Sequence, residues 1–466
     1  MMIFNNAEFR RNIWLDFSLQ RILLTSLIIG LIVYLFQLAG SHSTSAAIAF
    51  ALACYFIFLW GTKNASECVI EEVNLNTWDF QRQSALTPLE MSFGKLIGST
   101  AFAWYGTFIS LILYVFLALN TSTTATELSL YGQLFNVKTL DIGHEVILLL
   151  MGGLLTQSIA LILSLQVLSK ARHGHNIKTF RYFLIAIFIG GTITHQTFLL
   201  SSLSTTITWH HIEFNAASFI PISLFIFLIW SLIGVYRSFS KELQYSQIPW
   251  IWLIFNLYCV IYFSGFTFAA PLSEQLNEIE KLKDLQTVFK SAPIYTAFMV
   301  ALLLSYCAIL IDNVSYLQYK RLITHFNEKR IVEALNYSPL WIISVAFLLI
   351  TGLIAIASPL PLSKFIDSFS SSILILTTIL FLMRDIALMH YFTLKQKSRI
   401  LGTFVLYLFL LYVLFPFLLK VSQLNSLLPL FIPSYGQGNF VAFAGLFAQI
   451  GLIGFLIKIQ CKAYRV

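Results

Sequence analysis

The sequence predicts an all-α, polytopic membrane protein. Of its 466 residues, 58% are hydrophobic, only 11% are charged and 43 are Phe, which is too apolar for a soluble domain of this length. Apolar runs of about 17 to 25 residues recur along the chain, and each can cross a hydrocarbon core of roughly 30 Å as a helix. We predict about twelve transmembrane helices, at 22–40, 45–62, 96–119, 146–168, 180–203, 216–236, 249–270, 292–311, 340–358, 368–383, 400–419 and 439–457.

The distribution of cations predicts the orientation. If the N-terminus is cytosolic, the cytosolic segments hold 23 of the 29 Lys and Arg residues, so the positive-inside rule places both termini in the cytosol. The formal charge of +8 is therefore a topology signal, and we expect the lipid bilayer rather than a nucleic acid as its counterpart.

The chain divides at its polar segments. Residues 1–21 are predicted to form an amphipathic interfacial helix, because Phe9, Ile13 and Phe17 recur every four residues beside Trp14. An ordinary basic tail is the alternative. The remaining segments are a first bundle of six spans at 22–237 with a cytosolic segment at 63–95, two further spans within 238–311, a basic amphipathic cytosolic segment at 312–338 and a four-span bundle at 339–466.

The predicted spans hold no Asp, Glu, Lys or Arg away from their ends. Ionisable groups inside the membrane are how proton-coupled carriers move charge, so this class is disfavoured. A sodium-coupled carrier could still use carbonyls and hydroxyls at broken helices. An intramembrane metalloenzyme would need His and carboxylate pairs on facing helices, and the sequence offers no such metal site.

The most polar interior run lies in the fifth span, with Thr194, His195 and Gln196. These residues could line a substrate path, although a buried His more often makes a hydrogen bond between helices. The run Trp209-His210-His211 with Glu213 lies at the outer boundary of the membrane, where Trp and His are usually interface anchors rather than metal ligands.

The segment 63–95 is much longer than a turn between two helices requires. It combines charged Glu71, Glu72, Asp79 and Arg82 with apolar residues such as Trp78, so one face can pack on the bundle while another meets a partner. A capping box then starts the third span, with Thr87 as N-cap, Pro88 in the first turn and Glu90 three residues after the cap.

The Gly94-Lys95 pair does not belong to a nucleotide-binding P-loop. Leu96 follows the pair where a Ser or Thr is needed, and Leu89 occupies the place of the first Gly. If transport is driven by ATP, another polypeptide must bind the nucleotide.

This segment resembles the permease subunits of the ABC type-2 exporter class. The resemblance is carried by an acidic pair, a Thr, a short helix and a Leu-Thr-Pro-Leu run that leads to Gly-Lys: Glu71, Glu72, Thr77, Leu86, Thr87, Pro88, Leu89, Glu90, Gly94 and Lys95. The resemblance implies a transport permease of a bacterial cytoplasmic membrane, without enzymatic activity or cofactor of its own. It also implies that a separate ATP-binding subunit, which holds ATP and Mg²⁺, docks on the N-terminal helix and on Glu71, Glu72, Trp78, Asp79, Arg82, Thr87, Pro88, Glu90, Gly94 and Lys95.

The family usually has six spans, so twelve suggest a partial duplication. Residues 319–337 could be a second interfacial helix, and residues 384–399 follow the tenth span as 63–95 follow the second. A second coupling segment would then contain Arg384, Asp385, Lys395, Lys397 and Arg399; a merely basic inner loop is the alternative. One chain could supply both halves of the permease, or two copies could form a homodimer.

Two other classes remain open. An ion-coupled secondary transporter would work without an ATPase, and a membrane protein that handles lipid-linked substrates would need an acid/base pair that we do not find in the sequence. The many Phe residues favour an amphipathic or lipid-like cargo.

Overall fold

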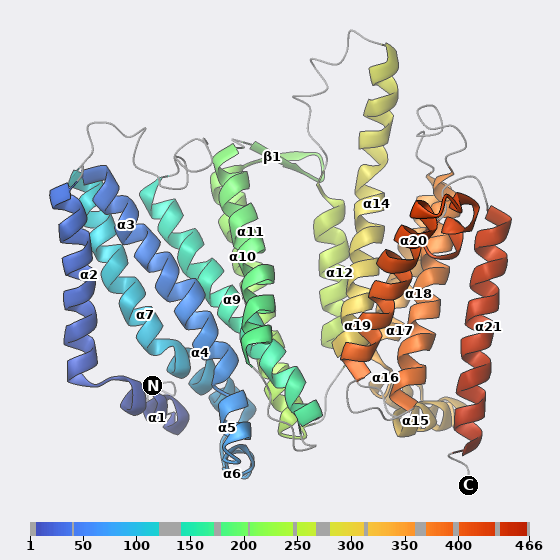
Figure 1. The fold of residues 1–466 in the computed structure, drawn as a ribbon, viewed down its shortest axis with the longest axis horizontal. Helices are drawn as coiled ribbons and strands as arrows, with labels where there is room; N and C mark the ends of the chain where they lie inside the picture. Colours follow the sequence, from blue (N-terminus) through green and yellow to red (C-terminus); the bar gives the residue numbers. More distant parts are fainter. Residues whose placement is uncertain are drawn as a thin grey trace. The chain divides into compact units, whose positions relative to one another are not determined.

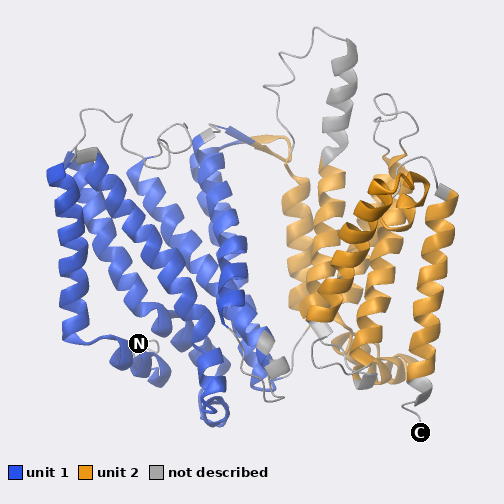
Figure 2. Cartoon of the chain, in the orientation of Figure 1, with its two compact units in different colours: residues 1–207, 214–247 blue, residues 208–213, 248–466 orange. Residues whose placement is uncertain are grey.

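The structure is a computed structural model and describes residues 6–39, 42–120, 141–171, 179–203, 206–245, 249–266, 280–311, 316–358, 370–394, 400–433 and 439–463. The described chain is helical except for one two-stranded hairpin and short connections. It splits into two compact units, which Figure 2 shows in different colours. Unit 1 comprises residues 1–207 and 214–247, and unit 2 comprises residues 208–213 and 248–466.

The described part of unit 1 contains six long helical segments and three short surface helices (Figure 1). The second long segment is nearly continuous through α3, the π-helical turn η1 and α4. The helical elements in chain order are α1 (Ala7–Asp16), α2 (Leu19–Ala39), α3 (His42–Cys54), η1 (Tyr55–Trp60), α4 (Gly61–Glu67), α5 (Ile70–Asn74), α6 (Trp78–Arg82), α7 (Pro88–Asn120), α9 (Ile142–Ala171), α10 (Phe180–Leu203) and α11 (Ala216–Glu242). The strands β1 (Thr206–Trp209) and β2 (Ile212–Asn215) lie between α10 and α11 in the chain, and their residues 208–213 belong to unit 2.

The described part of unit 2 also contains six helical segments besides two short helices, and the fifth of the six is formed by α19, a π-helical turn and α20. Its elements are α12 (Trp250–Ser264), α14 (Glu280–Ile311), α15 (Tyr316–Asn327), α16 (Ile331–Asn336), α17 (Leu340–Ala357), α18 (Ser371–Leu394), α19 (Ile400–Phe409), η3 (Leu410–Leu414), α20 (Phe415–Val421), the 3₁₀ turn η4 (Asn425–Leu430) and α21 (Asn439–Ala463). The structure thus groups the helices of 249–311 and 340–463 together, whereas the sequence suggested a separate pair and a four-span bundle.

Eleven of the described helical segments are long and apolar enough to cross a membrane. The chain is therefore an all-α, multi-pass membrane protein, as the sequence predicts. The helix at the predicted seventh span, α12, has 15 residues, which at about 1.5 Å per residue is shorter than a hydrocarbon core. The count of twelve spans stays a prediction.

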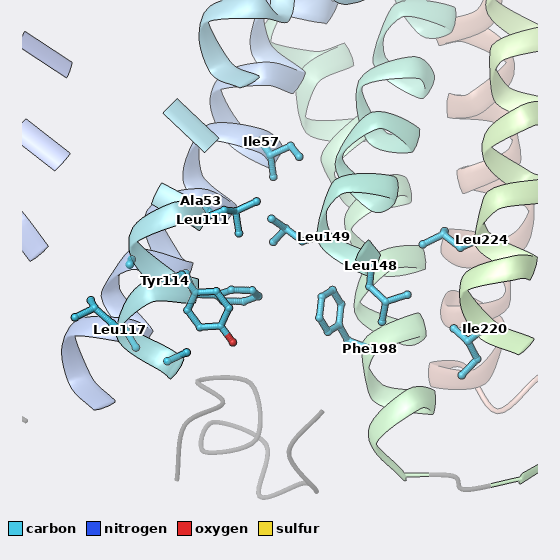
Figure 3. Close-up of a cluster of buried hydrophobic side chains, with 14 of the residues drawn as sticks. Ala53, Ile57, Leu111, Tyr114, Leu117, Leu148, Leu149, Phe198, Ile220 and Leu224 are labelled. Atoms are coloured by element: carbon cyan, nitrogen blue, oxygen red, sulfur yellow. The ribbon is translucent and has the colours of Figure 1, made fainter. Parts of the chain in front are cut away.

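The core of unit 1 lies where α3, α7, α9, α10 and α11 meet, and Figure 3 shows its side chains converging from these helices. Small residues allow α9 and α10 to approach closely. A Cβ on Gly152 would lie 2.4 Å from the Thr194 side chain, and one on Gly190 would lie 2.4 Å from Thr156. Close contacts of this kind hold membrane helices together, since lipid provides no hydrophobic force between them.

The two units repeat one order of elements. In each, two long helices are followed by a pair of short helices and then by four more long helices. The packing also repeats: the first helix contacts the second (α2 with α3; α12 with α14), the second contacts the third (α3 with α7; α14 with α17), and the fourth contacts the sixth (α9 with α11; α18 with α21). The helical pair α5–α6 therefore corresponds to α15–α16.

This repeat differs from the one suggested by the sequence. Residues 319–337 lie in α15 and α16, which correspond to α5 and α6 and not to the N-terminal helix. Residues 384–394 continue α18 and do not form a segment like 63–95. Among the described elements, the repeat in unit 2 runs from α12 to α21, and α1 precedes it in unit 1 only.

Candidate functional site

The start of α7 confirms the predicted capping box. The Thr87 backbone N–H donates to Glu90 Oε2 at 2.9 Å, and the Glu90 backbone N–H donates to Thr87 Oγ1 at 3.3 Å. Pro88 occupies the first helical position, where its missing N–H costs nothing. The capping box fixes the point at which the polar segment ends and the long helix begins.

The segment before α7 folds into two short helices, α5 and α6, which project from the end of unit 1 near α1 (Figure 1). Asn76 lies between them with a φ of 58°, the left-handed conformation that Asn tolerates. Trp78 begins α6 and is only 4% exposed, with its ring 6.4 Å from that of Phe239 in α11. The Trp78 ring therefore anchors the pair to the bundle, as the sequence suggested for one face of this segment.

A buried ion cluster, formed by Glu8, Arg11, Glu72 and Lys95, lies beneath this pair. Lys95 is 1% exposed, and its Nζ lies 2.8 Å from Glu8 Oε1 and also bonds Glu72. Arg11 Nη2 lies 2.8 Å from Glu8 Oε1 and also bonds Glu72. Two carboxylates and two cations balance, so the cluster can stay charged although Glu8 is 4% and Glu72 is 12% exposed.

The ion cluster joins three separate parts of unit 1. Glu8 and Arg11 belong to α1, Glu72 to α5 and Lys95 to α7. The resemblance assigned Glu72, Lys95 and the N-terminal helix to a docking surface, and no pattern in the sequence singled out Glu8 or Arg11 within that helix. The structure instead buries Lys95 inside the unit. The helix α7 begins at Pro88, eight residues before the predicted span, so Lys95 lies about two turns inside the helix.

The packing of α1 against α7 explains why a glycine precedes Lys95. A Cβ on Gly94 would lie 2.7 Å from Glu8 Cβ, so only Gly lets α1 lie this close to α7. The Asn12 side chain then donates to the Gly94 carbonyl O at 3.2 Å. Gly94 therefore makes room for α1, and Lys95 pairs with the carboxylate that α1 brings.

The outer face of the pair is exposed. We name it the α5–α6 tip and define it by Glu71, Leu75, Asp79 and Phe80. Leu75 is 72% and Phe80 76% exposed, and the Asp79 side chain is 82% exposed. Arg82 is mostly buried and lies 3.6 Å from Asp79. The tip thus presents two large apolar side chains between two carboxylates.

The structure corrects the second predicted coupling segment. The helix α18 continues to Leu394, so Arg384 and Asp385 lie near its middle, 1% and 0% exposed. The expectation that the spans hold no ionisable residue away from their ends was wrong, because hydropathy ended the span at the first charge. Lys395, Lys397 and Arg399 lie outside the described residues.

These two residues form a buried ion pair that other helices complete. Arg384 Nε and Nη2 donate to Asp385 Oδ1 at 2.9 and 2.8 Å, and Arg384 Nη1 donates to Gln449 at 3.2 Å. Tyr306 and Tyr412 donate to Asp385 Oδ2 at 2.8 and 2.7 Å. The side chains come from α14, α18, η3 and α21, so the pair ties most of unit 2 together.

Of the three residues of the candidate substrate path, Thr194 packs between helices. Thr194 is 3% exposed, donates to the Gly190 carbonyl O at 2.8 Å and lies against Gly152 of α9. His195 is half-buried and Gln196 is exposed on α10. Two described cavities, of about 290 and 450 Å³, are lined by other residues and do not include these three.

The Trp-His-His run forms the turn between β1 and β2. His210 and His211 have φ values of 47° and 65°, the conformation of a tight two-residue hairpin turn. The Trp209 indole N–H donates to the Tyr262 carbonyl O at 2.9 Å, which holds the turn on α12. Within the described part of the chain, no group of three or more His, Cys, Asp or Glu side chains could hold a metal ion.

Comparisons with known proteins add no family. No family model matches the chain, and neither the curated proteins nor the solved structures contain a match.

Proposed function

We propose that this chain is the membrane-spanning permease of an ATP-driven exporter and that a separate subunit binds and hydrolyses ATP. The observation that supports the proposal is the α5–α6 tip, an exposed apolar surface fixed to α1 and α7 through buried charges. A surface built only to connect two helices would not need this exposed tip or this anchoring. The resemblance of the same segment to ABC type-2 permeases supports an ATP-binding subunit as the partner.

In the proposed mechanism, closure of the ATP-binding subunits pushes on Asp79 and Phe80. Because Trp78 is packed on α11, the push moves the helical pair as one body. Glu72 passes the movement to Lys95 of α7 and to Arg11 of α1. A buried ion cluster suits this role, since separating its charges in a medium of low dielectric is costly. Movement of α7 against its neighbours would then open the path to the other side of the membrane.

The membrane, the orientation and the cargo are further parts of the proposal. The tip faces the cytosol of a bacterium and the protein lies in the cytoplasmic membrane, as the positive-inside rule and the resemblance suggest. An amphipathic or lipid-like cargo fits the Phe-rich chain. A chain with two repeated units supplies both halves of a permease without a second copy of itself.

Affinity purification of the tagged chain in mild detergent, followed by mass spectrometry, tests the proposal. We expect an ATP-binding subunit to co-purify with the wild-type chain, and its yield to fall with Phe80→Glu. Phe180→Glu is the matched control, because Phe180 is 63% exposed at the start of α10 and outside the tip. A folded, monodisperse wild-type preparation without any ATP-binding subunit would contradict the proposal.

The buried ion pair in α18 supports a second candidate function, an ion-coupled secondary transporter. Ionisable residues inside a membrane span commonly mark ion or proton pathways, and Asp385 with Tyr306 and Tyr412 is such a group. This candidate requires that the purified chain alone drives uptake from an ion gradient in proteoliposomes. Uptake that depends on ATP and a second subunit would exclude it.

A further inference from the structure

The helix α15 lies across one end of unit 2, transverse to the long helices (Figure 1). Tyr319 fixes it there, because its hydroxyl lies 2.9 Å from His390 Nε2 of α18 and accepts a hydrogen bond of 3.0 Å from the Trp341 indole N–H of α17. Trp341 is near the start of α17 and His390 near the end of α18, so α15 lies where both long helices end. The distribution of Lys and Arg predicts that this end is cytosolic.

One side of α15 is apolar and continues beyond its contact with the unit. Tyr319, Ile323 and Phe326 follow one another at spacings of four and three residues, which places them on the same side of the helix. Tyr319 contacts α17 and α18, whereas Ile323 is 55% and Phe326 67% exposed. The outer part of this apolar side is therefore left uncovered by the described residues.

Three exposed cations border the uncovered apolar part. Lys320 precedes Ile323 by three residues and is its neighbour on the helix surface. Lys329 lies in the turn that ends α15, where its backbone N–H donates to the Phe326 carbonyl O at 3.1 Å. Arg321 lies on the other side of Lys320, with its guanidinium 5.8 Å from the centre of the Tyr337 ring. We name Lys320, Arg321 and Lys329 the bordering cations.

The acidic residues of this segment are paired with other cations. Glu328 lies 3.5 Å from Arg330, and Glu333 lies 3.6 Å from Arg330 and 3.2 Å from His325 Nδ1. None of the bordering cations forms an ion pair with another described residue. Their charge is thus available to an anion from outside the described part of the chain.

We propose that α15 and the turn after it bind anionic phospholipids of the adjacent membrane leaflet. Ile323 and Phe326 lie among the acyl chains, and the bordering cations bind the headgroup phosphates. A helix parallel to the membrane, with bulky apolar residues on one side and Lys or Arg beside them, has the chemistry of this boundary. The Lys side chains keep their methylene groups beside the apolar residues while the ammonium groups reach the headgroups. The inference does not depend on the proposed function.

Charge distinguishes α15 from the corresponding pair in unit 1. The α5–α6 tip carries two carboxylates beside its apolar residues, whereas the bordering cations lie beside those of α15. A protein surface that complements one of them would therefore repel the other. The cytoplasmic leaflet has a negative surface potential that attracts cations within about a Debye length, and α15 lies at the ends of two spans, where this leaflet is its neighbour.

Photo-crosslinking in proteoliposomes of equal phosphatidylglycerol and phosphatidylcholine tests the inference on the full chain. Benzoylphenylalanine replaces Phe326 in one variant and Phe447 in the control, since these side chains are 67% and 61% exposed and Phe447 lies on α21. Mass spectrometry then gives the ratio of the two lipid adducts. At position 326 we expect phosphatidylglycerol adducts to exceed phosphatidylcholine adducts at least about fivefold, the effect of a single cation near an anionic surface. At position 447 we expect a ratio near one.

Substitution of the bordering cations shows whether they cause the preference. Lys320→Gln, Arg321→Gln and Lys329→Gln together should bring the ratio at position 326 close to one. Lys320→Arg with Lys329→Arg keeps the charges and should keep the preference. Lys241→Gln, which removes an exposed cation at the end of α11, should leave it unchanged.

Three results would overturn the inference. The first is a ratio near one at position 326 of the otherwise unchanged chain, which would mean that the apolar side faces lipid without selecting its charge. The second is a preference that survives removal of all three bordering cations. The third comes from the same position-326 variant in cells: an adduct with a protein as the main product would assign the surface to an acidic protein. None of these results bears on the α5–α6 tip, so the proposed function is tested separately.

Discussion

Replacing Lys95 by Met tests whether the ion cluster joins α1, α5 and α7. The substitution keeps most of the side-chain volume but removes the charge between Glu8 and Glu72, which are 4% and 12% exposed. Breaking a buried ion pair by removing one partner costs about 3–5 kcal/mol, because the remaining charge is left uncompensated. Arg11 still contacts both carboxylates and is 40% exposed, so we expect a loss near the lower limit, about 3 kcal/mol.

The assay is equilibrium unfolding in mixed micelles with rising SDS, followed by Trp fluorescence. Lys95→Met should lower the free energy of unfolding by about 3 kcal/mol. Lys95→Met with Glu72→Gln should recover a large part of the loss, since the second change removes a carboxylate that the first leaves unpaired. Glu72→Gln alone is the control for loss of that carboxylate. A Lys95→Met variant within about 0.5 kcal/mol of the wild type, the range of ordinary surface substitutions, would refute this reasoning.

Three further substitutions probe the packing of each unit. Gly94→Ala should push α1 away from α7, because the new Cβ would lie 2.7 Å from the Glu8 side chain. Limited proteolysis should then cleave the chain near residue 16 faster than in the wild type. An unchanged cleavage rate would count against the contact between α1 and α7. Trp78→Ala should cost about 3–5 kcal/mol in the same unfolding assay, since the ring is 4% exposed, and a loss below about 1 kcal/mol would show that α6 is not anchored there. Asp385→Asn should lower the free energy of unfolding by about 3–5 kcal/mol, because Arg384 stays buried without its carboxylate. The double variant Arg384→Met with Asp385→Leu removes both charges and should be less destabilised than Asp385→Asn. A double variant that is less stable than Asp385→Asn would contradict this account.

Local patterns in the sequence predicted local structure well. The apolar runs predicted the long helices, since burial in lipid requires only composition and length. The Thr87, Pro88 and Glu90 pattern predicted the start of α7, because a capping box closes within four residues. The same run also directed attention to the segment that forms the α5–α6 tip.

Contacts between distant residues could not be predicted in this way. Glu8 meets Lys95 across 87 positions of the chain, and nothing in the sequence near either residue indicates the other. Hydropathy likewise ended the tenth predicted span before Arg384. Hydropathy cannot distinguish a charged side chain exposed to lipid from one that is paired inside the protein, as Arg384 is with Asp385, whose carboxylate also accepts a hydrogen bond from Tyr306 of another helix. A few similar residues suggest a different alignment of the two halves from the one that the order and contacts of the helices define.

Photo-crosslinking from the α5–α6 tip in cells tests the central claim most directly. A benzoylphenylalanine residue replaces Phe80 in one variant and Phe180 in the control, since both side chains are well exposed in unit 1. We predict an adduct between position 80 and a protein that carries a nucleotide-binding sequence, and none with that protein from position 180. Lipid adducts alone at position 80, from a folded protein in its own membrane, would contradict the assignment of the tip to an ATP-binding subunit.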